Sequence, residues 1–381
     1  MFFVACFIGC LGWVNTVFEW AQVIILLIPA LWHAASNRFA GGAVFAGYTL
    51  LASHSLIVGM ATYFNIPIYQ SSLLWLLAGL PNFLIGVMCW RQDPLKRTLF
   101  IPVLIVIHAI PPFALLGWGN PITAAGWLFP GWGWGGIVST IIVMMVLSRP
   151  SRFVARLLCI VPVLAVAAYA TTSHQPVQIT DWQGYNTHYQ YGAGLHQTRN
   201  LITEYMQQKA LQNQIDSAYK VHVFPESVGG VWNDAIAKDC RRFVVDRAPE
   251  HIILLGTHQR TSEKSYDNVI IKMDAQSTEV VYRQRVPAPF GMWKPWHDDS
   301  ANADWFGTSN AKIAGKKVGF LLCYESMLVF PVIQMMVGKP DIITLSASTW
   351  WAPDSLHSAQ VLAVHSWANL FNVPTIEAYN L

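Results

Sequence analysis

The hydrophobic positions divide the chain into two parts of different texture. Through residue 171, long apolar runs alternate with short polar loops, and several runs have the length that a helix needs to cross a bilayer. The pattern predicts about seven membrane-spanning segments, near residues 2–14, 20–33, 43–63, 72–90, 99–118, 126–147 and 154–171. We interpret the short first run as a span or a re-entrant helix, with a removed signal peptide as the alternative.

From residue 172 onward the apolar runs are shorter and are separated by polar, turn-forming residues. Strand-like runs occupy 221–223, 252–255, 269–271, 318–322, 342–345 and 373–378. Stretches of helical character lie between them, at 198–219 and 358–372. Because strands and helices alternate, the sequence predicts an α/β domain over residues 172–381 that follows a transmembrane domain over residues 1–171.

The distribution of charge predicts how the chain lies in a membrane. Charged residues make up only 12% of the chain, about half the usual share, and they are scarce in the first 171 residues. Basic residues fall in alternate loops, at Arg38, Arg91, Lys96, Arg97, Arg149, Arg152 and Arg156, whereas loops 64–71 and 119–125 have none. The positive-inside rule then predicts a cytoplasmic amino terminus and an extracytoplasmic α/β domain, periplasmic in a Gram-negative inner membrane. A transporter is disfavoured, because the spans hold few ionisable residues.

Two strand ends carry side chains that are suited to acyl chemistry. Cys323 follows the apolar run 318–322 directly, where a thiol nucleophile would be delivered into a polar turn. Glu226 follows the run 221–223 in the same manner and is a candidate general base. Alone, each has a simpler interpretation, as a buried thiol and a strand-end cap. Together they favour catalysis.

These segments resemble the nitrilase (carbon-nitrogen hydrolase) superfamily. The resemblance rests on Phe224-Pro225-Glu226-Ser227, Gly256-Thr257, Tyr266-Asp267-Asn268, residues 282–291 (YRQRVPAPFG) and Cys323-Tyr324-Glu325, in that order and spacing. It is greatest to the membrane-fused branch, which contains the apolipoprotein N-acyltransferases and the TraB proteins of conjugal-transfer operons. It covers residues 175–381 by motif and implies a four-layer α-β-β-α sandwich with a Glu-Lys-Cys catalytic triad.

The chain departs from this family pattern at the lysine. The lysine position falls on Gln284, and the glutamate that closes the family's motif falls on Met292. A glutamine retains a neutral donor but loses the charge that favours a thiolate and an oxyanion. Lys294, Arg283 and Arg285 are alternative sources of charge. Alternation along a strand would point both arginines to the opposite face unless a bulge intervenes.

The resemblance also predicts the surroundings of the thiol. Tyr324 and Glu325 would shape the substrate pocket, beside a turn whose N–H groups favour an oxyanion. Trp350 and Trp351 lie in the family's substrate loop, where they would form a membrane-facing lid or simply pack in the core. The acyltransferases continue into a closing transmembrane helix, so the chain is expected to be shortened at its carboxyl-terminal end.

Other kinds of site receive less support. The histidines are scattered without metal-ligand spacing, so neither a metal nor a cofactor is expected, and no nucleic-acid partner is indicated. The local signature of a papain-like cysteine protease is absent. A disulfide between Cys240 and Cys323 stays open in an oxidising compartment, and it would remove the nucleophile.

The sequence therefore predicts a membrane-bound thiol acyltransferase or amidase that works through a Cys323 thioester. The resemblance implies a membrane phospholipid as donor, a protein or peptide amine as acceptor, and proteins of the conjugation machinery as partners. The competing hypothesis is a catalytically degenerate domain that serves as a membrane assembly factor for a conjugation apparatus. It is favoured by Gln284 and Met292 and opposed by the intact motifs around Glu226 and Cys323.

Overall fold

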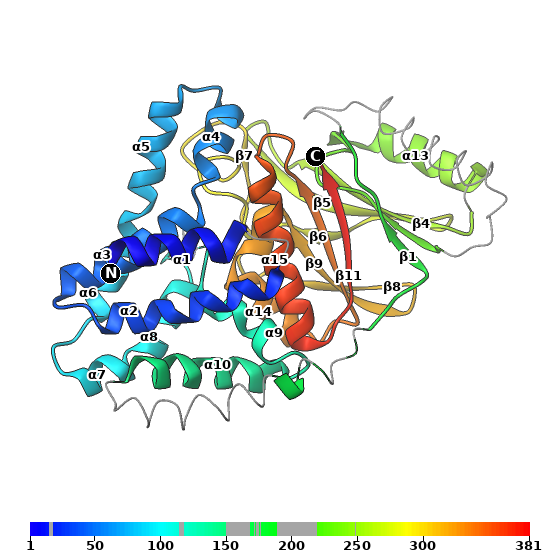
Figure 1. The fold of residues 1–381 in the computed structure, drawn as a ribbon. Helices are drawn as coiled ribbons and strands as arrows, with labels where there is room; N and C mark the ends of the chain where they lie inside the picture. Colours follow the sequence, from blue (N-terminus) through cyan, green and yellow to red (C-terminus); the bar gives the residue numbers. More distant parts are fainter. Residues whose placement is uncertain are drawn as a thin grey trace. The chain divides into compact units, whose positions relative to one another are not determined.

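The contacts between residues divide the chain into two compact units, one helical and one α/β. The computed structural model describes residues 1–14, 18–113, 118–149, 168–170, 172, 175, 177–188, 219–247 and 249–381 (Figure 1). The helical unit comprises Met1–Pro176, Met327–Phe330 and Trp351–Val373, and the α/β unit comprises Val177–Ser326, Pro331–Trp350 and Pro374–Leu381. Residues 351–373, which the sequence analysis assigned to the α/β domain, therefore group with the helices.

The helical unit is built from short apolar helices. In chain order they are α1 (Phe2–Val14), η1 (Glu19–Leu27), α2 (Ile28–His33), α3 (Arg38–Ala52), α4 (Leu56–Phe64), α5 (Ile68–Ala78), α6 (Leu80–Cys89), α7 (Pro94–Leu99), α8 (Ile101–Ala109), η3 (Pro121–Ala124), α9 (Ala125–Leu128), α10 (Gly133–Ser148) and α15 (Asp354–Phe371). Glycines let α3 and α6 approach closely, since a Cβ on Gly86 would lie 2.9 Å from the Cα of Gly42.

The lengths of these helices bear on the predicted spans. Among the described residues, one continuous segment, Ile68–Cys89, is long and apolar enough to cross a bilayer. Two bent pairs, α3 with α4 and η3–α9 with α10, would raise the number to three if each pair formed one span. In the described part of the predicted run 99–118, the helix α8 is nine residues long, from Ile101 to Ala109. The run 154–171 lies mostly outside the described residues, so seven spans stay a prediction.

The α/β unit contains two sheets. Its elements are β1 (Trp182–Gly184), β2 (Val221–Val223), β3 (Val231–Trp232), α13 (Asp234–Arg247), β4 (Ile252–Arg260), β5 (Ser265–Met273), β6 (Thr278–Arg283), β7 (Ser300–Ala301), β8 (Asn310–Ile313), β9 (Lys316–Leu322), η4 (Cys323–Met327), α14 (Val329–Val337), β10 (Ile342–Ser348) and β11 (Thr375–Asn380). One sheet has the order β1-β2-β4-β5-β6, with β3 beside β4 and β7 beside β5, and the other has the order β11-β10-β9-β8. The predicted strands are thus confirmed. The predicted helical stretch 198–219 falls almost wholly among residues that the structure does not describe.

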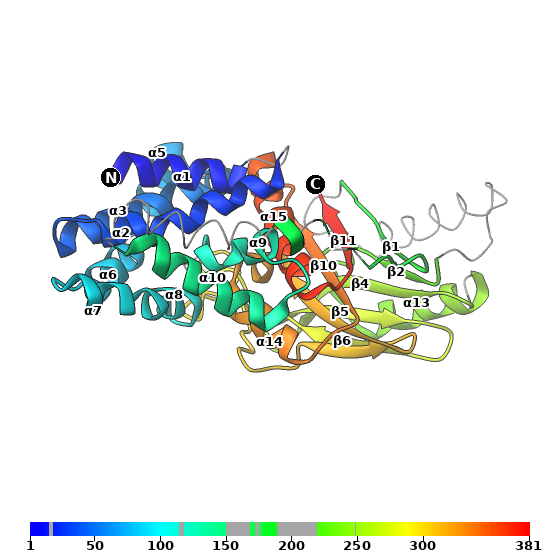
Figure 2. The same cartoon turned by 60° about the horizontal axis from the view of Figure 1, so that its bottom comes forward.

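The two sheets pack face to face over one apolar core. Val223 and Leu254 of the first sheet meet Phe320, Leu322 and other residues of the second. Helix α13 covers the outer face of the first sheet through Cys240 and Val244. Helix α14 lies against β9, where a Cβ on Gly319 would meet the Met335 side chain at 2.6 Å. The layers are therefore α, β, β and α, and Figure 2 shows α13 outside the first sheet.

Candidate functional site

Cys323 lies where strand β9 ends and the chain turns sharply. Its backbone φ is +46°, in the left-handed region that non-glycine residues seldom adopt. The turn η4 begins at this residue, and α14 follows from Val329. The thiol is not in a disulfide and is nearly buried, with 7% of the residue exposed. Strain of this kind is characteristic of functional positions, so the predicted strand-end thiol has a second structural feature in its favour.

Glu226 is held in the loop after β2 by contacts with both sheets. Strand β4 passes directly beside it, and a Cβ on Gly256 would lie 2.5 Å from the Glu226 Cα. Only glycine permits this approach, which accounts for the Gly256-Thr257 motif. From the second sheet, Ser346 Oγ donates a hydrogen bond of 3.1 Å to the carbonyl of Phe224. The glutamate backbone is thus fixed between β4 and β10.

The structure brings the carboxyl group of Glu226 and the thiol of Cys323 together in a hydrogen bond. Asn268 Nδ2 donates to Glu226 Oε1 at 2.6 Å, and the backbone N–H of Ser348 donates to Oε2 at 3.0 Å. Burial raises the pKa of Glu226 to about 7, the hydrogen bonds from Cys323, Asn268 and Ser348 oppose the rise, and the charge of Glu325 adds to it. A carboxyl group with this pKa can both accept and return a proton near neutral pH.

Gln284 joins the same hydrogen-bond chain. Its Oε1 accepts from Asn268 Nδ2 at 2.9 Å, and its Nε2 donates to the carbonyl of Leu322 at 3.1 Å. The two groups at the ends of this series of hydrogen bonds, the Leu322 carbonyl and the ionised Glu226 carboxylate, can only accept. They therefore determine the orientation of both amide side chains. Asn268 Oδ1 is buried and has no hydrogen-bond partner within the described parts of the chain. Gln284 thus lies beside Glu226 and the strand that ends at Cys323.

Glu325 is the centre of a separate buried network. It accepts from Tyr282 Oη at 2.6 Å, and from the backbone N–H groups of Arg285 at 2.7 Å and Leu322 at 2.8 Å. The Arg285 guanidinium lies 3.9 Å from Glu325 and donates to Tyr282 Oη and Gln334 Oε1. Burial lowers the pKa of Arg285, but Tyr282 and Glu325 reverse the effect, so its pKa is raised. The network holds both ends of the turn at Cys323.

The alternative cations lie elsewhere. Arg283 is partly exposed and pairs with Asp267, as strand alternation predicts. Arg285 is fully buried, contrary to the expectation that it would share the orientation of Arg283, because β6 ends at Arg283 and alternation stops there. Its charge is directed to Glu325. Lys294 is half-buried, and its backbone N–H donates a hydrogen bond to Ser300 Oγ at 3.0 Å.

The remaining predicted pocket residues fall in different places. Tyr324 is half-buried in η4, directly after the thiol. Trp350 belongs to the α/β unit and is 36% exposed. Trp351 groups with the helical unit, where its ring packs against Gly59 and lies edge-to-face with Tyr63 at 5.5 Å. The lid role of these indoles stays a prediction.

Two participants were missed by the sequence analysis. Asn268 was noted only as part of a motif, and Ser348 was not noted at all. Asn268 lies on β5 opposite Gln284, whose backbone N–H donates to the Asn268 carbonyl at 2.8 Å. The signal in the sequence was a polar residue directly before the apolar run 269–271 of a strand. Ser348 contributes only a backbone N–H, for which no side-chain signal exists.

Metal and disulfide chemistry find no support in the described residues. Within them, no group of three histidine, cysteine or acidic side chains converges on one point. Cys240 and Cys323 are not joined in a disulfide, and Cys240 lies on the buried face of α13. His258 contacts Ser227 Oγ at 2.9 Å, and burial lowers its pKa to about 4, so it is neutral at pH 7.

Comparison with known proteins identifies relatives along almost the whole chain. A probable conjugal transfer protein TraB of Sinorhizobium fredii is 29% identical over 385 residues, which cover 98% of this chain and 95% of that protein. This chain is a homologue of the TraB conjugal-transfer proteins. The conjugal transfer protein TraB of Agrobacterium fabrum is also 29% identical, over 98% of this chain and 90% of its own length. No model of a protein family matches this TraB homologue.

Solved structures that resemble the chain come from the nitrilase superfamily. An amidase from Nesterenkonia sp. is 12% identical and covers 55% of this chain and 81% of its own, with a TM-score of 0.40. A carbon-nitrogen hydrolase from Helicobacter pylori is 12% identical and covers 53% and 75%, with a TM-score of 0.39. Identities of 12% and TM-scores of 0.40 or less support no argument about the function of this chain. The function therefore has to be inferred from the geometry around Cys323.

Proposed function

We propose that this TraB homologue is a thiol acyltransferase or amidase that forms a thioester on Cys323. The observation that carries the proposal is the hydrogen bond between the Cys323 thiol and a buried carboxyl group whose pKa is about 7. A nucleophile beside a base that is itself oriented by other groups is the arrangement that covalent catalysis needs. Here Asn268 and the N–H of Ser348 orient the base.

The reaction divides into two half-reactions. In the first, Glu226 accepts the thiol proton while the sulfur attacks an ester or amide carbonyl carbon. The tetrahedral intermediate collapses, the carbon–oxygen or carbon–nitrogen bond breaks, and Glu226 returns the proton to the leaving group. In the second, Glu226 accepts a proton from an incoming amine or water, whose nitrogen or oxygen attacks the thioester carbonyl. The carbon–sulfur bond then breaks, and Glu226 returns the proton to the sulfur of Cys323, which regenerates the thiol.

Gln284 would take part as a neutral hydrogen-bond donor. Its Nε2 donates one hydrogen to the Leu322 carbonyl, directly before Cys323, which leaves a second hydrogen for an oxyanion. Loss of one such donor typically lowers the rate about 10²–10³-fold, and a cation would be stronger than the amide. We therefore expect a slow enzyme. Tyr324 and Glu325 would shape its substrate pocket.

The substrates and location follow from the same proposal. The helical unit exposes many large apolar side chains, among them Leu73, Leu77 and Leu80, as expected of a bundle surrounded by lipid. We infer a multi-pass protein of a bacterial inner membrane with a periplasmic α/β unit. A phospholipid ester is then the most accessible acyl donor. The relatives are described as conjugal transfer proteins, which supports a role in conjugation, and we infer a protein amine of that apparatus as the acceptor.

The thioester can be tested directly. The full chain in detergent is incubated with phospholipid, quenched in acid and digested, and the Cys323 peptide is examined by mass spectrometry for a hydroxylamine-sensitive acyl adduct. The expected adduct is present in the wild type and absent from Cys323→Ala and Glu226→Ala. Cys240→Ala is the matched control, since this buried thiol lies on the inner face of α13, in the core. Wild-type conjugation frequency with Cys323→Ala would exclude the enzymatic proposal.

A second candidate function has one observation in its favour. The chain lacks the cation of the implied triad, and the Gln284 amide is instead engaged by Asn268 and Leu322. A degenerate domain that serves as a membrane assembly factor would tolerate this loss. That hypothesis predicts that Cys323→Ala and Glu226→Ala conjugate normally, whereas variants that unfold the α/β unit do not.

A further inference from the structure

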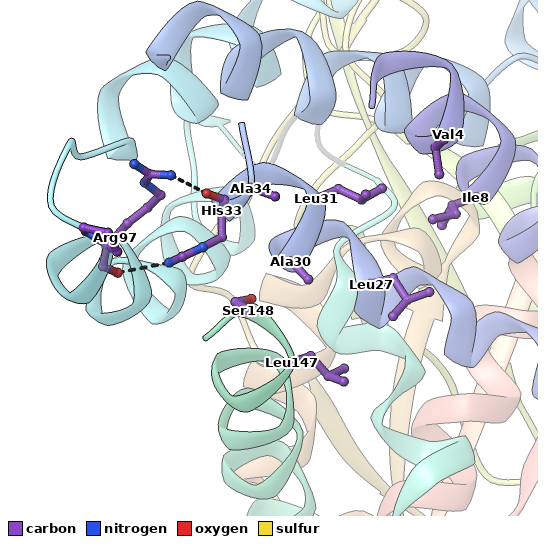
Figure 3. Close-up of a pocket in the computed structure, with 11 residues that line it drawn as sticks. Val4, Ile8, Leu27, Ala30, Leu31, His33, Ala34, Arg97, Leu147 and Ser148 are labelled. Carbon is purple, nitrogen blue, oxygen red and sulfur yellow. Dashed lines mark hydrogen bonds between the residues drawn. The ribbon is translucent and has the colours of Figure 1, made fainter. Parts of the chain in front are cut away.

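A cavity of about 450 Å³ lies within the helical unit, well inside the range of roughly 300–1,000 Å³ that is typical of small-molecule sites. Residues of α1, η1, α2, α7 and α10 line it (Figure 3). Its two ends differ in character. Val4, Leu27 and Leu147 form an apolar end, and His33, Arg97 and Ser148 lie toward the other. A ligand that fits this lining has a hydrocarbon part and a polar head.

The polar end of the cavity carries a positive charge. The Arg97 guanidinium is held 4.1 Å from the centre of the Trp90 ring and donates to four backbone carbonyls, those of His33, Ala35, Arg91 and Gln92. None of the ion pairs found in the described part of the chain includes it. Asp93, the nearest acid along the chain, interacts electrostatically with Arg97 and also caps α7 by accepting from the N–H of Lys96. The loop 91–97 still holds three basic residues, Arg91, Lys96 and Arg97, against this one acid, so this end keeps a net positive charge that attracts an anion.

We propose that this cavity binds an anionic phospholipid, with one acyl chain along Val4, Leu27 and Leu147 and the phosphate toward Arg97 and Ser148. The charge distinguishes this lipid from a zwitterionic one, and the apolar end distinguishes it from free phosphate. The proposal depends on the inferred membrane location but not on the chemistry of Cys323. The basic loops around Arg97 place the head group in the cytoplasmic leaflet by the positive-inside rule.

The lipid preference is measured by native mass spectrometry of the full chain released from detergent. Phosphatidylglycerol, phosphatidylcholine with the same acyl chains, and inorganic phosphate are the probes. We expect one phosphatidylglycerol to be retained per chain, about fivefold more tightly than phosphatidylcholine, because one basic residue near a membrane surface contributes about 1 kcal/mol. Equal retention of the two lipids, or displacement of phosphatidylglycerol by inorganic phosphate, overturns the proposal.

Two variants with matched controls locate the site. Leu147→Trp fills the apolar end, and its control is Ile142→Trp, on the same helix but 53% exposed and outside the lining. Ser148→Asp places a carboxylate at the polar end, and Ser148→Asn is its neutral control. Both test variants should weaken retention at least about fivefold, and both controls should retain the lipid. Test and control variants that behave alike overturn the assignment. Alkylation of Cys323 should be unchanged in all four, which separates this site from the proposed enzyme.

Discussion

Replacing Glu226 by glutamine tests the proposed base through its pH dependence. The carboxyl group has a pKa of about 7, chiefly because it is buried. Its ionised fraction is therefore about 90% at pH 8 and about 1% at pH 5. Glutamine has a similar shape but cannot accept the thiol proton at any pH. Only the wild type should show an inflection in thiol reactivity near pH 7.

The size of the effect follows from the same values. General base catalysis typically contributes about 10²–10⁴-fold. At the lower bound, the wild type should react with iodoacetamide about 100-fold faster than Glu226→Gln at pH 8. Since the ionised fraction falls about 100-fold between pH 8 and pH 5, the two rates should converge at pH 5. Alkylation of the Cys323 peptide, followed by mass spectrometry from pH 5 to pH 9, measures both rates.

Linkage supplies an independent check of the pKa. Because the folded-state pKa of Glu226 is raised, its contribution to stability is fully present below its ordinary pKa of 4.5 and is lost as the pH rises through about 7. The cost of burying the carboxylate at pH 8 is ~3 kcal/mol. Glu226→Gln should therefore gain thermal stability relative to the wild type as the pH rises from 4.5 to 8. Parallel alkylation profiles, or a stability difference that does not change with pH, would refute the assignment of the base.

Three further outcomes are expected. Gln284→Lys should lower the pKa of Glu226 by about 1–3 units and raise thiol alkylation at pH 6 about five- to tenfold, and an unchanged rate would show that the third group lies elsewhere. Gly256→Ala should shift the Glu226 loop and reduce alkylation of Cys323 about 100-fold, whereas Gly135→Ala, with open space around its Cβ, should leave the rate unchanged. Equal rates in the two variants would contradict the close approach of Gly256 to the Glu226 backbone. A phosphatase reporter active only outside the cytoplasm should work after residue 175 and fail near residue 95, and the reverse pattern would overturn the proposed orientation.

Local patterns were sufficient for the strands and the turn but not for long-range pairing. Each apolar run that ended in a polar turn became a strand, so the positions of Glu226 and Cys323 could be predicted. The chain of amides depends instead on the register of β5 with β6, which shifts by a bulge between Ile270 and Ile271. That register places Asn268 opposite Gln284, and no local pattern encodes it.

The helical half illustrates a different limit. Hydropathy measures how apolar a run is, whereas its geometry depends on where the helix breaks. The run 43–63 is interrupted between Ala52 and Leu56 and bends by 58°. Helix α8 ends at Ala109, before Pro111 and Pro112, whose rings remove backbone donors. The grouping of 351–373 with the helices was also unpredictable, because it depends on contacts such as Ser366 with Thr123 that are far apart in sequence.

The replacement of lysine by glutamine changes the proton chemistry as well as the charge. A lysine beside Glu226 would hold the carboxylate ionised and its pKa low. Arg285, the buried cation of the separate network around Glu325, is directed to Glu325, and burial raises the pKa of Glu226 to about 7. A general base is most effective when its pKa is near the working pH, so in the proposed mechanism the weaker oxyanion donor is accompanied by a better-matched base. Gln284→Lys should therefore raise thiolate formation at acidic pH while making Glu226 a poorer acid toward the leaving group. Comparing thiol alkylation with acyl transfer in this variant separates the two effects. An increase in both would show that the glutamine is only a loss.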